Sequence, residues 1–76
     1  MDDLDRALRT IADIAGDQGL VYWVTELDGV VLAAPVDAPQ LVYFVDEHGL
    51  RPAGVEYPVQ SSARWQVTSD GTVLDF

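Results

Sequence analysis

The sequence predicts an α+β fold in which one N-terminal amphipathic helix packs on an antiparallel meander of four to five strands. Apolar residues recur at helical spacing near the start, whereas short β-branched and aromatic runs alternate with turn residues from Gly19 onward. In addition, residues 23–32 and 65–74 share the pattern W-x4-D-G-x-V-L, and an Asp-Gly pair between such runs is typical of a hairpin turn. The 76 residues contain no linker or low-complexity tract, so residues 1–76 are predicted to form a single small domain.

The predicted helix covers residues 3–15. Its apolar stripe follows the i, i+3, i+4, i+7 pattern that buries one face of a helix. Asp2 or Asp3 is expected to cap its N-terminus, and Gly16 is expected to end it in a left-handed conformation. The stripe consists of Leu4, Leu8, Ile11 and Ala15, flanked by Ala7, Ala12 and Ile14.

Strands are expected to follow one another with short connections. Prolines make residues 35–39 a loop, and residues 46–49 form a polar turn. Residues 50–59 contain Pro52 and Pro58, so we expect at most an edge strand there. The expected strands are residues 20–27, 30–34, 41–45, 63–68 and 72–76.

Two Asp-Gly hairpins join these strands, at residues 28–29 and 70–71. We expect a two-residue turn at each, with both central residues at positive φ. The likeness of the two segments is interpreted as convergence rather than duplication, because only five of ten positions are identical. Trp23 and Trp65 then occupy equivalent places, and their rings share a face if the two strands are neighbours.

Apolar side chains occupy both faces of the predicted strands. Val21 and Trp23 alternate with Tyr22 and Val24, and Tyr43 is followed by Phe44. One helix covers one face of a sheet, and monomeric proteins rarely expose a large apolar patch. We therefore expect the second face to meet another copy or another protein. The alternative is that the sheet curls into a half-barrel around its own aromatic residues.

The charge balance narrows the choice of partner. Thirteen acidic residues and four basic ones give a formal net charge of -9, and all four basic residues are arginines. Such a charge disfavours direct binding to nucleic acid or to an anionic membrane and attracts a basic partner. The simpler interpretation is that the negative charge only keeps the protein soluble. No signal peptide or spanning segment is visible, so a cytoplasmic protein is expected.

Chemical motifs are sparse. The chain lacks Cys and has one His, His48, in an acidic turn, which favours a solvated residue over a metal ligand or base. Ser61, Ser62 and Ser69 lack a nucleophile elbow, and neither a calcium loop nor a phosphate-cradling glycine motif occurs. We therefore expect no metal, no cofactor and no enzymatic activity.

The function predicted is that of a small acidic, non-catalytic protein-binding module. The absence of Lys and Asn is typical of a GC-rich coding sequence, and a phage or mobile-element accessory protein that occludes a basic or apolar surface of a larger protein fits this composition. The alternative is a structural or assembly protein that forms a homo-oligomer, such as a homodimer, through its sheet. The candidate interface residues are Val21, Trp23, Tyr43, Phe44, Asp46, Glu47 and Trp65.

Overall fold

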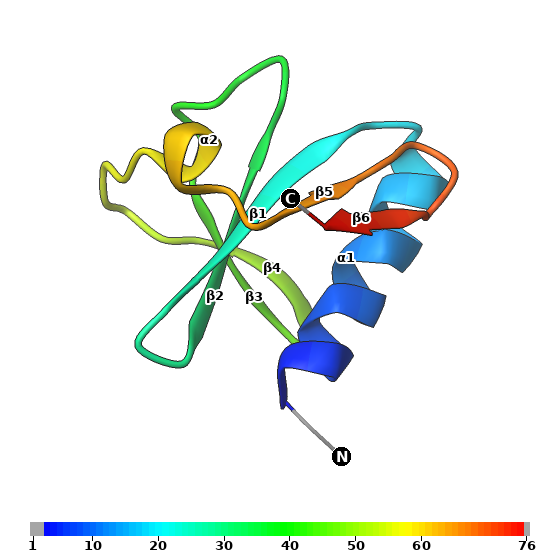
Figure 1. Ribbon diagram of the computed structural model, residues 1–76, viewed down its shortest axis with the longest axis horizontal. Helices are drawn as coiled ribbons and strands as arrows, with labels where there is room; N and C mark the ends of the chain where they lie inside the picture. Colours follow the sequence, from blue (N-terminus) through cyan, green and yellow to red (C-terminus); the bar gives the residue numbers. More distant parts are fainter. Residues whose placement is uncertain (1–2, 76) are drawn as a thin grey trace.

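The computed structural model describes residues 3–75 and shows an α+β domain (Figure 1). Helix α1 (Asp3–Gln18) packs on one face of a six-stranded antiparallel sheet, and the short helix α2 (Val59–Ser62) packs on the other. The predicted fold class is confirmed, with one strand more than expected. Asp2 and Phe76, which the predicted helix cap and last strand include, lie outside the described residues.

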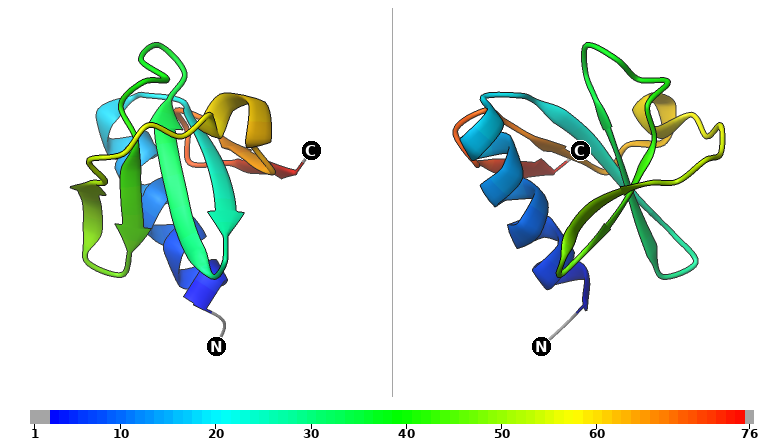
Figure 2. Two further views of the ribbon diagram at one scale, coloured as in Figure 1. Left: turned by 90° about the vertical axis from the view of Figure 1, so that its left-hand side faces the viewer. Right: turned by 180° about the vertical axis from the view of Figure 1, so that it is seen from behind.

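The strand order in the sheet is β4-β3-β2-β1-β5-β6. The first four strands form the predicted meander, and β4 is the edge strand expected in the proline-containing stretch. The chain then crosses the second face of the sheet through residues 53–64, so that β5 pairs with β1 (Figure 2). The strands are β1 (Tyr22–Leu27), β2 (Val30–Pro35), β3 (Tyr43–Asp46), β4 (Gly49–Pro52), β5 (Trp65–Val67) and β6 (Val73–Asp75).

Helix α1 extends beyond the predicted end. Gly16 lies within the helix, and Gly19 instead has the positive φ of 70° that ends it. The backbone N–H of Gly19 donates to the carbonyl of Ala15 at 2.8 Å. The prediction that the helix ends at Gly16 is wrong, because Asp17 and Gln18 continue the helix. These two polar residues do not extend the apolar stripe, which was the only helical signal in the sequence.

The first Asp-Gly hairpin is the two-residue turn predicted. Leu27 pairs with Val30 across it, and both central residues have positive φ, 51° at Asp28 and 81° at Gly29. This is the turn whose twist matches that of the flanking strands.

The second Asp-Gly hairpin differs, which corrects the prediction of two equivalent turns. Thr68 donates its N–H to the carbonyl of Thr72 at 2.9 Å, which leaves a three-residue loop in which only Gly71 has positive φ, 87°. The Asp70 carboxylate accepts hydrogen bonds from the Thr68 hydroxyl and from the Thr72 N–H. These bonds hold the pKa of Asp70 below its usual value. The two flanking threonines thus select the longer loop.

The two tryptophans lie at different register positions in the β1–β5 pair. Trp65 lies opposite Val24 of β1, whereas Trp23 lies opposite Gln66. Side chains alternate between the faces of a strand, so the two indole rings lie on opposite faces of the sheet. The expectation that they share a face is therefore wrong.

The main core lies between α1 and the sheet. Ile11 of the helix and Val24 and Val67 of the sheet are fully buried there. Tyr22 is also buried, and its hydroxyl donates to the Gln18 side chain at 2.6 Å. Burial, followed by the nearby Tyr43, raises the pKa of Tyr22.

The second face carries its own smaller core, because the chain folds back over it. Val59 of α2 is fully buried against this face, and the buried Thr25 hydroxyl donates to the Ser62 carbonyl at 2.9 Å. The expectation that this whole face needs another molecule is therefore wrong for its centre. A four-residue helix is too short to show a periodic signal in the sequence. The cluster comprises Leu32, Ala34, Val42 and Val59, with Trp23, Phe44, Ala53 and Tyr57 packed against it.

Within residues 3–75, neither helix has the length and apolar character needed to cross a membrane.

Candidate protein-binding surface

The two tryptophans proposed for the interface lie largely inside the molecule. Trp65 is 8% exposed in the core under α1, and the Arg64 guanidinium carbon lies 5.0 Å from its ring centroid. Arg64 also approaches the Glu26 carboxylate at 3.6 Å. Trp23 is half-buried beside the second-face cluster. Neither ring therefore presents a wide surface to a partner.

The other apolar candidates are half-buried and do not form one patch. Val21 precedes β1, and its carbonyl accepts the Val36 N–H at 2.9 Å. Tyr43 and Phe44 are neighbours on β3 and therefore point to opposite faces. Of these residues, only Phe44 lines a hollow on the surface.

The second face remains uncovered at the end of the β1–β2 hairpin. Leu27 and Val30, which face each other across the turn, are 42% and 43% exposed. Val55, in the segment that crosses this face, is 55% exposed. A hollow of about 330 Å³ lies between them, and we call it the hairpin groove. Its lining residues are Leu27, Asp28, Val30, Leu32, Phe44, Val55, Glu56 and Tyr57.

The charges of the hairpin groove have one sign. Its lining includes the carboxylates of Asp28 and Glu56, which are both exposed, and no arginine or histidine. Neither carboxylate takes part in an ion pair among residues 3–75. The groove is therefore an apolar hollow beside uncompensated negative charge.

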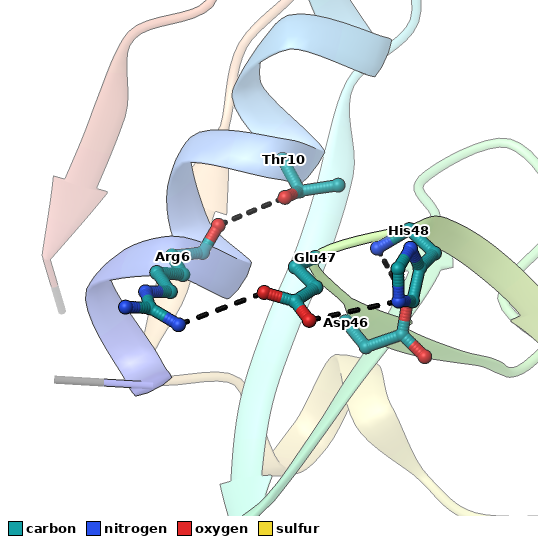
Figure 3. A network of polar contacts seen from close by, with 5 residues as sticks. All are labelled: Arg6, Thr10, Asp46, Glu47 and His48. Carbon is teal, nitrogen blue, oxygen red and sulfur yellow. Dashed lines mark hydrogen bonds and ion pairs between the residues drawn. The ribbon is translucent and has the colours of Figure 1, made fainter.

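A larger cleft of about 730 Å³ lies on the other side of the hairpin, between α1 and the β3–β4 turn. Here opposite charges pair within the chain (Figure 3). The Glu47 carboxylate lies 3.6 Å from both the Arg6 guanidinium and the His48 imidazole. Arg51 contacts Asp46 at 2.9 Å. The acidic candidates Asp46 and Glu47 are thus engaged with the chain's own cations.

The chemical groups of this cleft are open to solvent. The backbone N–H of His48 donates to the Asp46 carboxylate at 2.8 Å, but the His48 side chain is 83% exposed. A general acid or base functions best with a tuned pKa in a shielded site. Within the described part of the chain, no group of three or more His, Cys, Asp or Glu residues is placed to hold a metal ion.

The prediction missed the residues that form the hairpin groove, apart from Phe44. Leu27 and Val30 flank the Asp-Gly pair, and a two-residue turn places such residues opposite each other at the end of the sheet. The positions of Leu27 and Val30 could therefore have been predicted from the sequence. No sequence signal indicated Val55 and Tyr57, because only the crossing of the chain over the second face brings them to the groove.

No family model, curated protein or solved structure matches this chain.

Proposed function

We propose that this chain is a small acidic protein-binding module, without catalytic activity, that covers a basic or apolar surface of a larger protein. The hairpin groove carries this proposal. Among residues 3–75, seven large hydrophobic residues are exposed, and three of them, Leu27, Val30 and Val55, meet at this one hollow. Scattered exposed hydrophobic residues need no explanation, but a cluster around a concave surface is typical of an interaction site.

The net charge supports a basic partner. A charge of -9 on 76 residues produces a negative potential that speeds the approach of a positively charged surface. Binding of this kind weakens as salt screens the field. A cytoplasmic phage or mobile-element accessory protein that blocks a larger protein remains the biological role proposed, on the basis of composition.

Capture of binding proteins from a cell extract tests the proposal when groove variants are compared. The test variant is Leu27→Ser with Val30→Ser, and the matched control is Leu20→Ser with Leu41→Ser, which changes two leucines of similar exposure outside the groove. We expect a protein that the wild type and the control retain and that the groove variant loses, with less retained at high salt. Capture of the same proteins by all three chains, or of none by the wild type, would contradict the proposal.

A second candidate function is assembly of a homo-oligomer through the β6 edge. The other edge, β4, is protected by the exposed Arg51 and by Pro52, which has no N–H to donate. At the β6 edge, Val73 and Leu74 are 37% and 43% exposed. Sedimentation at micromolar concentration tests this: a dimer that Leu74→Glu dissociates supports assembly, and a wild-type monomer excludes it.

A further inference from the structure

We infer that the hairpin groove takes a single large apolar side chain from a partner segment whose neighbouring residues are Lys or Arg. This inference rests on the proposed function and deepens it by naming the chemistry of the partner. It follows from the size of the groove, from the composition of its walls and from the position of its carboxylates.

The size of the groove limits what enters it. Its volume of about 330 Å³ lies at the lower end of the range of about 300–1,000 Å³ that is usual for ligand sites. This is room for one large side chain and not for the face of a helix bundle. The buried Leu32 and the half-buried Phe44 line it from the sheet. A large aliphatic or aromatic side chain that enters therefore meets an apolar floor.

The walls of the groove come from two different segments. Leu27 and Val30 belong to the β1–β2 hairpin, whereas Val55 and Tyr57 belong to the chain that crosses the second face. Each wall carries one carboxylate next to its apolar residues. Asp28 follows Leu27, and Glu56 lies between Val55 and Tyr57.

This arrangement selects the residues beside the anchor. A segment that places its apolar side chain in the groove brings its sequence neighbours close to the two walls. Cationic neighbours then meet Asp28 and Glu56, which have no ion-pair partner among residues 3–75. Acidic neighbours are repelled. A second copy of this chain is disfavoured for the same reason, because it brings a further charge of -9 to the negative rim.

Nuclear magnetic resonance titration of the full chain with three synthetic pentapeptides tests the inference. The first peptide has a central Leu flanked by two Arg on each side, the second replaces Leu by Gly, and the third replaces the Arg residues by Glu. We expect the first to shift the amide resonances of Leu27, Val30 and Val55 and to bind at least about tenfold more tightly than either of the others. Equal binding of the Leu and Gly peptides would refute the apolar anchor, and equal binding of the Arg and Glu peptides would refute the charge selection.

Two charge variants locate the effect. Asp28→Asn with Glu56→Gln removes the groove carboxylates and keeps the turn, since Asn is favoured at positive φ. Asp13→Asn with Asp17→Asn makes the same change in net charge on the exposed side of α1. We expect the groove variant to bind the Arg peptide at least threefold more weakly at low salt and the α1 variant to bind it within a factor of two of the wild type. Similar losses in both would assign the effect to net charge and overturn the inference.

The peptide titration and the extract experiment test different claims, so their negative results can be told apart. If no peptide shifts the groove resonances while the extract experiment still yields a protein that the groove variant loses, the anchor inference is wrong and the binding function stands. If the extract yields no groove-dependent protein and the peptides also fail, both are wrong.

Discussion

Replacing Val59 by Ala tests whether the crossing segment is part of the folded core. Val59 is fully buried in the second-face cluster, and the change removes two methyl groups from it. Each buried methylene-sized group contributes about 0.8 kcal/mol, and the cavity left behind adds to the loss. We therefore expect the free energy of unfolding to fall by about 2–3 kcal/mol. A domain of 76 residues has a total of about 4–11 kcal/mol, so the variant loses a large share.

Val55→Ala is the matched control for this prediction. The two valines lie four positions apart in the same segment, but Val55 is 55% exposed and Val59 is 0% exposed. Exposed substitutions usually change stability by less than about 0.5 kcal/mol. Val55→Ala should therefore leave unfolding unchanged while weakening the binding of the Leu-containing peptide. The pair separates the part of the second face that the chain covers from the part that stays exposed.

Urea unfolding followed by tryptophan fluorescence measures both variants, because Trp23 packs against the cluster that contains Val59. The slope of the free energy against urea should stay constant while the midpoint falls for Val59→Ala. A loss below about 0.5 kcal/mol for Val59→Ala, equal to that of the control, would show that the second face is not packed by this segment. Such a result would instead support the expectation from the sequence that the second sheet face is largely uncovered.

Three further predictions concern single residues. Tyr22→Phe should lower the free energy of unfolding by about 1 kcal/mol at neutral pH, because it removes the hydrogen bond to the end of α1. Burial raises the folded-state pKa of Tyr22, so the wild type should lose stability as pH rises above about 10, and the variant should lack this loss. Urea midpoints at pH 7 and at high pH measure both effects. Gly71→Ala should destabilise more than Gly29→Ala in thermal unfolding, since both have positive φ but only at Gly71 does an added Cβ approach a backbone atom, the Ala12 carbonyl oxygen at 3.3 Å. Asp70→Asn should reduce stability most at neutral pH, and the difference in stability from the wild type should shrink as pH falls through the lowered pKa of Asp70. Urea midpoints measured across this pH range test the prediction, and a constant difference would contradict the role of the ionised carboxylate.

The two hairpins show how far local sequence determined the fold. Asp28-Gly29 and Asp70-Gly71 are the same dipeptide between similar strands, and the presence of a turn was predictable at both. The length of the second loop was not predictable, because the Asp70 carboxylate accepts hydrogen bonds from the Thr68 hydroxyl and the Thr72 N–H, which select a longer loop. The faces of the two tryptophans depend instead on the pairing of β1 with β5, two strands far apart in the sequence. This pairing places Trp65 opposite Val24, so the two indole rings do not form a common surface.

The candidate surface was only partly accessible from the sequence for a different reason. The excess of apolar residues on both strand faces was visible, and Phe44, one of the predicted interface residues, lines the hairpin groove. What covers the second face depends on residues 53–64, which contain two glycine or proline breaks before Val59 and no periodic pattern. Their contribution is tertiary: Val59 packs and Val55 does not, although the two look alike in sequence.

The uncovered end of the sheet follows from the length of the chain. A six-residue strand such as β1 extends about 20 Å, whereas a single crossing of the face by a segment with a helical turn covers a strip of about 10 Å. One crossing therefore covers Thr25 and Leu32 and leaves the hairpin end of β1 and β2 open. This open end holds the Asp28-Gly29 turn, in which both central residues have positive φ. Leu27 and Val30 add little to folding there, because their side chains are only partly covered. Polar residues at these two positions would serve solubility better, so their apolar side chains support the proposed contact with a partner.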